Sequence, residues 1–87
     1  MNQKPGHWEI YIVRSRTGKL YTGISTDVER RFREHRAGKR GARFFRLSPA
    51  SEIVYREAQP DRAAASRREA AIKKMTRCQK LALIDDL

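Results

Sequence analysis

The chain has 87 residues, of which 20 are Lys or Arg and 10 are Asp or Glu, giving a formal net charge of +10 at pH 7. One small core can form at this length, whereas two independent cores would each be too small to be stable, so we expect a single domain over residues 1–87. So large a positive charge favours a polyanionic partner, and nucleic acid ahead of a membrane, because no segment pairs a long apolar face with a purely basic one.

The cysteine count and the hydropathy pattern restrict the chain further. Cys78 is the single cysteine, which excludes an intrachain disulfide and a cysteine zinc cage, and we expect it to be a small buried hydrophobe. Residues 1–6 are polar and lack the apolar segment of a secretory signal, and no apolar run is long enough to span a bilayer. We therefore expect a cytoplasmic protein.

The first predicted elements are two strands joined in a hairpin. Residues 8–13 and 20–24 are rich in β-branched and aromatic side chains, which favour strands. Between them lies Gly18, which can take the left-handed position of a bulged loop of about three residues. Pairing of Ser15 with Lys19 would then close the hairpin.

This loop sets the register of the hairpin, and the register decides where two tyrosines lie. With a three-residue loop, Val13 lies opposite Tyr21. Tyr11 then lies opposite Gly23, so that both tyrosines are diagonal neighbours on one face of the sheet. A four-residue loop would separate the tyrosines onto opposite faces.

A helix is predicted after the hairpin. Residues 26–29 read Thr-Asp-Val-Glu, the pattern of a capping box with Thr26 as the cap, and Gly38 is well placed to end the helix. Val28 and Phe32 must face the sheet to be buried. The remaining charged positions of this helix, Arg30, Arg33, Glu34 and Arg36, are expected to be solvated.

The same helix carries two residues that can act on a substrate. Arg31 and His35 share the side of Val28 and Phe32, so we expect both at the edge of the contact with the sheet. After the helix, residues 38–49 combine basic residues with two phenylalanines, which resembles a phosphate-holding surface. The side chains assigned to binding of the nucleic-acid backbone are Lys39, Arg40, Arg43 and Arg46.

The last third of the chain predicts one strand and two helices. Residues 52–56 form a third strand, and Pro60-Asp61 introduces an alanine-rich helix that runs to about residue 75. Residues 76–79 form a second capping box before a final helix. The residues of that helix expected to face inward are Leu81, Ala82 and Ile84.

Two tyrosine triplets, an Arg-x-x-x-His helix and a glutamate on a later helix occur in this order along nearly the whole chain. They are Glu9-Ile10-Tyr11, Tyr21-Thr22-Gly23, Arg31 with His35, and Ser66-Arg67-Arg68-Glu69. The combination resembles the GIY-YIG nuclease superfamily and, within it, the small stand-alone bacterial proteins. Residues 21–31 and 68–74 look especially like that branch.

The resemblance implies an α/β fold of the α+β kind, with a small, mainly antiparallel sheet of three strands flanked by helices. It also implies an endonuclease that hydrolyses phosphodiester bonds with one divalent metal, Mg²⁺ or Mn²⁺, held mainly by Glu69. DNA is expected ahead of RNA, with structural or weak sequence selectivity, a role in repair or recombination, and a protein partner possible for targeting. The implied catalytic residues are Tyr11, Tyr21, Arg31, His35 and Glu69.

The reaction needs these residue types. A water must lose a proton, and Tyr11, Tyr21 and His35 all remain candidates for the base. A free phenol has a pKa of about 10, so nearby cations must lower it. Arg31 favours phenolate and also clamps phosphate oxygens. Glu69 shares its helix side with residues 65 and 72, an inward side on which an unpaired carboxylate is costly.

Each assignment has an ordinary structural alternative. A strand tyrosine usually packs with its hydroxyl at the surface. Arg31 can be a solvated charge, and His35 a helix-end residue favoured by the dipole. Glu69 can simply pair with Lys73 four residues on. The rival functions are a nucleic-acid-binding module without useful catalysis and, after it, a protein-interaction subunit of a repair complex.

Three positions depart from the family's pattern. Glu9 replaces the first glycine, and Thr22 replaces the isoleucine of the second triplet. Ile24 stands where some relatives carry a lysine, which removes a cation that could activate a tyrosine. The 87 residues carry no attached DNA-recognition domain, so target selection is expected to come from substrate shape or from a partner.

Overall fold

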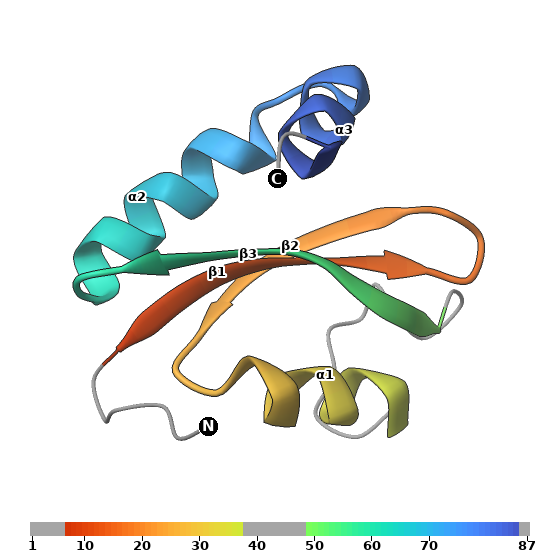
Figure 1. Cartoon of the computed structure of the whole chain (residues 1–87), viewed down its shortest axis with the longest axis horizontal. Coiled ribbons are helices and arrows are strands. Elements are labelled where there is room, and N and C mark those ends of the chain that lie inside the picture. The colour runs from red at the N-terminus through yellow and green to blue at the C-terminus, as the bar shows by residue number, and fades with distance from the viewer. Residues whose placement is uncertain (1–6, 38–48, 86–87) are drawn as a thin grey trace.

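A three-stranded antiparallel sheet with helices on both faces forms the body of the protein. The computed structural model describes residues 7–37 and 49–85. In chain order the elements are β1 (Trp8–Ser15), β2 (Leu20–Ser25), α1 (Val28–Ala37), β3 (Ala50–Gln59), α2 (Arg62–Lys73) and α3 (Arg77–Asp85). Figure 1 shows α1 below the sheet and α2 and α3 above it. This arrangement confirms the predicted α+β fold.

The strand order is β2-β1-β3, with β1 antiparallel to both neighbours. The hairpin loop is the predicted one, because the Ser15 amide donates to the Lys19 carbonyl at 2.8 Å and Gly18 has a φ of 90°. Val13 therefore lies opposite Tyr21, and residue 11 lies opposite residue 23. The predicted register is confirmed, and both tyrosines lie on the α1 face.

The two faces of the sheet bury two separate clusters. Tyr11, Val13, Val28 and Ala50 pack on the α1 face, joined by half-buried neighbours that include Phe32. On the opposite face the buried residues are Ile10, Ile12, Tyr55 and Ile72. Because successive strand residues alternate between faces, β1 supplies large side chains to both clusters. Tyr11 of β1 and Tyr21 of β2 therefore both lie on the face that α1 covers.

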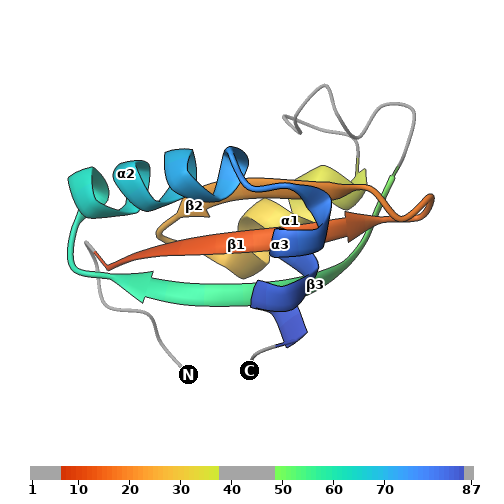
Figure 2. The ribbon, with the colours of Figure 1, turned by 90° about the horizontal axis from the view of Figure 1, so that it is seen from above.

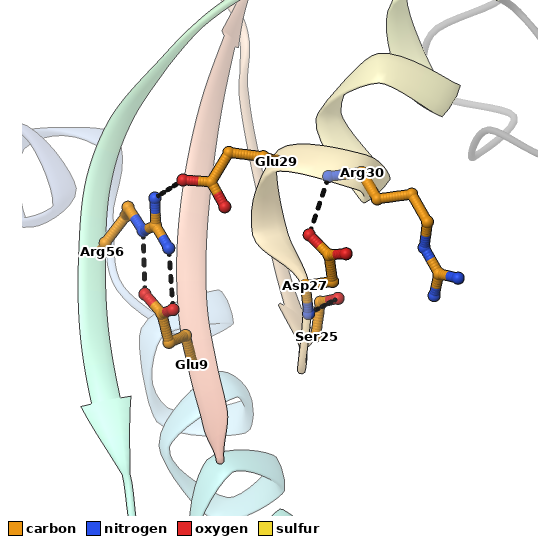
Figure 3. Close-up of polar contacts among 6 residues, drawn as sticks. All are labelled: Glu9, Ser25, Asp27, Glu29, Arg30 and Arg56. Carbon is orange, nitrogen blue, oxygen red and sulfur yellow. Dashed lines mark hydrogen bonds and ion pairs between the residues drawn. The ribbon is translucent and has the colours of Figure 1, made fainter. Parts of the chain in front are cut away.

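The cap of α1 differs from the prediction by one residue. Asp27, not Thr26, caps the helix, because its Oδ1 accepts from the Arg30 amide at 3.1 Å. The Asp27 amide donates in turn to Ser25 Oγ at 2.9 Å (Figure 3). Glu29, the other half of the predicted box, contacts an arginine on β3 instead. The helix ends at residue 37, one residue before the glycine expected to end it.

The third strand is twice as long as predicted. It spans residues 50–59 rather than 52–56, because it pairs with β1 along the whole length of that strand, from Trp8 opposite Gln59 to Ser15 opposite Ala50. Two register shifts interrupt the pairing. The phosphate-holding surface predicted at residues 38–49 lies almost entirely outside the described residues.

The last two helices follow their predicted caps. Asp61 caps α2 by accepting from the Ala64 amide, although the helix ends at residue 73 rather than 75. Thr76 and Gln79 cap α3 reciprocally, with each side chain accepting from the other's amide. No helix of the described ranges is long and apolar enough to cross a membrane.

The residues of α3 that face inward differ in part from those predicted. Leu83 and Ile84 pack against the cluster around Ile72, whereas Ala82 is exposed, so its predicted inward position is wrong. The helix buries no residue completely and rests on the cluster through one side only. Cys78 is exposed as well, contrary to expectation, because it lies on the outer side of the same helix.

Candidate active site

Three aromatic rings from three elements meet on the α1 face. Tyr11 of β1 and His35 of α1 are each 1% exposed, and the Tyr11 Oη lies 3.1 Å from His35 Nε2. Tyr21 of β2 completes the group, with its ring centroid 5.3 Å from His35 and 6.4 Å from Tyr11. His35 is therefore buried within the contact with the sheet, and the prediction that it lies at the edge is wrong. The predicted register is what brings the two phenols together.

Gly23 makes room for the Tyr11 phenol. A β-carbon at this position would lie 2.6 Å from the Tyr11 Oη and 2.7 Å from its Cζ, much closer than real β-carbons approach other atoms. A glycine at the position opposite Tyr11 leaves this space for the phenol. The third residue of the second triplet thus sets the position of the hydroxyl.

Arg31 brings a positive charge to this group. Its guanidinium hydrogen-bonds the Tyr11 side chain, and its Nη1 pairs with Glu34 Oε1 at 2.9 Å. Both residues are half-buried, so Glu34 is not the solvated charge predicted for it. The spacing of three positions on one helix is the signal that could have identified this pair. Arg31 is held between a phenol and a carboxylate.

Burial keeps both Tyr11 and His35 neutral near pH 7. Burial and the nearby Tyr21 raise the pKa of Tyr11 above its usual value of 10.0, against an opposing effect of Arg31. Burial and, to a lesser extent, the charge of Arg31 together lower the pKa of His35 from 6.5 to about 4. Arg31 can only donate, so the Tyr11 oxygen accepts from it. The arrangement that satisfies all three groups has the Tyr11 hydroxyl donating to Nε2 of a neutral His35.

Glu69 approaches from the other side of β2. It is half-buried on α2, on the same helix side as the buried Ala65 and Ile72, and its Oε2 lies 3.2 Å from Lys73 Nζ. The negative charge of Glu69 also raises the pKa of Tyr11, which puts the carboxylate within electrostatic reach of that phenol. Figure 2 shows α2 running beside β2, an edge of the three-stranded sheet. Glu69 therefore lies on the inward side of α2 and also pairs with Lys73, so the two alternatives stated for this residue are both true.

The donor chemistry at Glu69 fits Mg²⁺ or Mn²⁺. These ions accept one carboxylate together with waters and phosphate oxygens, and they do not need nitrogen or sulfur ligands. Within residues 7–37 and 49–85, no three His, Cys, Asp or Glu side chains gather as a ready cage. Lys73, which now pairs with the carboxylate, is 54% exposed in its side chain and can turn away into solvent. Glu69 is thus the residue here that would hold such an ion.

An ion-pair network fixes α1 over the sheet, and sequence reasoning missed it. Arg56 of β3 donates to both carboxylate oxygens of Glu9 on β1, at 2.7 and 2.8 Å, and also pairs with Glu29 at the start of α1 (Figure 3). These contacts raise the pKa of Arg56, and its hydrogen bond lowers the pKa of Glu29. Glu9, a departure from the family's glycine, therefore has a structural partner. The network holds in place the helix that carries Arg31 and His35.

All five residues proposed as catalytic lie in the described ranges. Four of them, Tyr11, Tyr21, Arg31 and His35, lie together on the α1 face, and Glu69 faces them across the edge strand. The four residues predicted to bind the nucleic-acid backbone, Lys39, Arg40, Arg43 and Arg46, lie outside the described residues.

Comparison with known proteins decides the family. The GIY-YIG catalytic domain matches residues 7–82. The chain belongs to the GIY-YIG family, a family of nucleases. Its bacterial relatives include the UPF0213 protein PA3854 of Pseudomonas aeruginosa, 49% identical over 77 residues that cover 88% of this chain and 73% of the relative. The UPF0213 protein YhbQ of Escherichia coli is 42% identical over 77 residues, 88% of this chain and 76% of the relative.

Two solved structures share the fold. The solution NMR structure of protein EF2693 from E. faecalis is 35% identical, covers 99% of this chain and 90% of its own, and has a TM-score of 0.64. That of the UPF0213 protein BH0048 from Bacillus halodurans is 32% identical, covers 91% and 83%, and has a TM-score of 0.58. The predicted membership in the small bacterial branch is confirmed.

Proposed function

We propose that this GIY-YIG protein is a cytoplasmic, metal-dependent endonuclease that hydrolyses phosphodiester bonds of DNA in repair or recombination. The observation that carries the proposal is the contact of the Tyr11 hydroxyl with His35 and Arg31, within electrostatic reach of Glu69. Membership in a nuclease family supports the reaction class. The net charge of +10 supports a polyanionic substrate.

Arg31 binds the phosphate in this proposal. Negative charge grows on the phosphate oxygens during hydrolysis, and a fixed planar cation in a half-buried position is screened less than one in open water. Substrate binding draws Arg31 from Glu34 toward the phosphate. Mg²⁺ or Mn²⁺ held by Glu69 supplies, when bound, further neutralisation of phosphate charge and polarisation of the attacking water.

Tyr11 and His35 together remove the proton of the water. Tyr11 alone is a poor base because burial raises its pKa. Its hydroxyl donates to His35, so the water proton can pass to the Tyr11 oxygen as the phenol proton passes to Nε2. A bound phosphate offsets the charge of Arg31 that lowers the pKa of His35, which makes the imidazole a better acceptor once substrate is present. The water oxygen then attacks phosphorus.

Tyr21 is assigned to the leaving group. Its ring lies edge-on to His35, so its hydroxyl belongs to the same group of side chains. The P–O bond breaks as the leaving oxygen gains a proton, and a neutral phenol can donate one. In this proposal Tyr11 acts on the attacking oxygen and Tyr21 on the leaving oxygen of the same phosphorus atom.

Substrate choice is proposed to rest on shape. Exposed arginines of α1, among them Arg30, Arg33 and Arg36, are suited to contact the backbone of a nucleic acid. Backbone contacts carry no sequence information directly, so structure-selective or weakly sequence-specific cleavage is the expected behaviour. DNA is the proposed substrate ahead of RNA, and a protein partner would add targeting.

The proposal is tested by incubating purified protein with branched, nicked and single-stranded DNA, and with RNA of the same sequence, in Mg²⁺ or Mn²⁺. We expect cleavage of DNA that Glu69→Ala lowers by at least about 100-fold. Lys73→Ala is the matched control, because it removes the partner of Glu69 and leaves the carboxylate. Equal cleavage by the wild type and Glu69→Ala would defeat the assigned mechanism.

A second candidate is a nucleic-acid-binding module without useful catalysis. It is favoured by the pairing of Arg31 with Glu34 and of Glu69 with Lys73, because each proposed functional charge already has a partner of opposite sign. Salt-sensitive DNA binding with no cleavage in any metal would support this candidate. Metal-dependent turnover that Arg31→Ala abolishes would exclude it.

A further inference from the structure

Three cationic side chains converge on a pocket at the α3 side of the sheet. Lys19 of the hairpin loop and Arg77 and Lys80 of α3 line a pocket of about 260 Å³ together with Leu20. Leu20 packs with the cluster beneath α2 and α3, so the pocket lies on the face opposite the tyrosines. None of the three cations forms an ion pair with a residue in 7–37 or 49–85.

The chemistry of this pocket suits a phosphate. The described lining residues contain three positive charges and no acid, and like charges held this close repel each other until an anion lies between them. A water occupies about 30 Å³ in the liquid, so the pocket has room for an anion together with several waters. Lysine and arginine donors contact phosphate oxygens readily and without sequence preference.

The pocket is close to the proposed catalytic group along β2. Leu20 and Tyr21 are consecutive, and their side chains point to opposite faces of an edge strand in the described sheet. Gly23, which lies beneath the Tyr11 hydroxyl, is three residues further along β2, or about 10 Å. The phosphates of one strand repeat every 3.4 Å along the axis of a DNA duplex, so a single backbone extends well beyond this distance. One backbone lying along this edge can therefore reach both places.

We propose that Lys19, Arg77 and Lys80 bind a backbone phosphate of the nucleic-acid substrate, on the same strand as the bond that is cut. This assignment rests on the proposed function for the identity of the substrate. It adds a second anchoring point, on the far face of β2, to the group around Arg31. The strand then passes around the edge of the sheet between Glu69 and the tyrosines.

The test is a comparison of two variants that lose the same charge. Arg77→Gln/Lys80→Gln removes two cations of the pocket, and Arg67→Gln/Lys74→Gln removes two exposed cations elsewhere, one on α2 and one directly after it. Binding of a fluorescent single-stranded DNA is measured in EDTA by anisotropy at several salt concentrations. Circular dichroism checks that each variant is folded.

We expect the pocket variant to bind at least about tenfold more weakly at low salt, with a slope of log K against log salt that is smaller by about 1 to 2. The control variant should keep most of the wild-type slope. Equal losses in the two variants would overturn the proposal. The proposal would also be overturned if the pocket variant bound DNA normally but lost binding of an acidic polyglutamate peptide. That result would indicate that the pocket binds an acidic protein partner.

The binding measurement in EDTA separates this proposal from the nuclease proposal. Cleavage is measured on the same proteins with Mn²⁺. Weaker DNA binding by the pocket variant, with no cleavage by the wild type, would support the phosphate site and refute the nuclease. Cleavage by the wild type, with unchanged binding by the pocket variant, would support the nuclease and refute the phosphate site.

Discussion

The hydroxyl oxygen of Tyr11 lies over Gly23, only 2.6 Å from the position that a β-carbon on residue 23 would take. A single methyl group at this position must shift the phenol and so disturb its contact with His35, since the displaced atoms belong to a rigid ring. The place of the Tyr11 hydroxyl is therefore decided by the residue opposite it on the neighbouring strand.

Gly23→Ala is expected to lower the cleavage rate by at least about 100-fold, because misplacement of a reacting group by about 1 Å has an effect of this size. The free energy of unfolding should fall by only about 1–3 kcal/mol, the usual effect of overpacking. Single-turnover cleavage and urea unfolding measure the two effects. A variant with wild-type activity would show that the place of the Tyr11 hydroxyl does not matter for the reaction.

Thr22→Val is expected to stabilise the protein. Thr22 is buried beside Gly23 but points to the opposite face, and within the described residues its hydroxyl oxygen has no hydrogen-bond partner. Valine has nearly the same shape and no polar group, so the free energy of unfolding should rise by about 1 kcal/mol. Cleavage should be unchanged. Destabilisation in urea unfolding would mean that the hydroxyl is satisfied in solution.

The hairpin and its register could be predicted because local residues determine them. A glycine at position 18 sets the loop, the loop sets the pairing, and the pairing puts the two tyrosines on one face. The cap of α1 could not be chosen between Thr26 and Asp27 in the same way, because Glu29 is drawn away by an arginine 27 residues later. Tertiary contacts override local patterns at such positions.

The candidate site could be predicted only in part, for the same reason. Its residues were identified from their order along the chain, but the burial of His35 depends on how α1 lies on the sheet. Glu34 could not be separated by sequence from the solvated charges of the same helix, so its ion pair with Arg31 was not predicted. The reach of Glu69 to the tyrosines depends on the helix that follows β3 lying beside β2, which no local pattern specifies.

Arg56→Gln is expected to lower the free energy of unfolding by about 1–3 kcal/mol. The change leaves Glu9, whose side chain is 16% exposed, without its two hydrogen bonds and close to the charge of Glu29. Arg14→Gln is the matched control, because its pair with Glu52 is about half exposed on both sides and should contribute less than about 1 kcal/mol. Equal effects of the two changes would show that the network does not anchor α1.

Acid is expected to destabilise the protein partly through His35. Its pKa is about 4 in the folded protein and 6.5 in the unfolded chain, so the unfolded chain binds more protons between these values. Stability should therefore fall as pH decreases from about 6.5 to 4, by at most about 3 kcal/mol from this group. His35→Gln should show a shallower decrease in urea unfolding across that range. An identical decrease in both proteins would mean that His35 is free to ionise.

In the proposed reaction the Tyr11 hydroxyl takes part in cutting the phosphodiester bond. Tyr11→Phe removes one oxygen atom and keeps the ring that packs on the sheet, so its single-turnover cleavage of a nicked duplex in Mn²⁺ is the most direct measurement. We expect a rate at least about 100-fold below that of the wild type, with DNA affinity nearly unchanged. The free energy of unfolding should fall by about 1–3 kcal/mol, because the change removes the buried hydrogen bond to His35 Nε2. Cleavage by Tyr11→Phe at the wild-type rate would contradict this role of the hydroxyl.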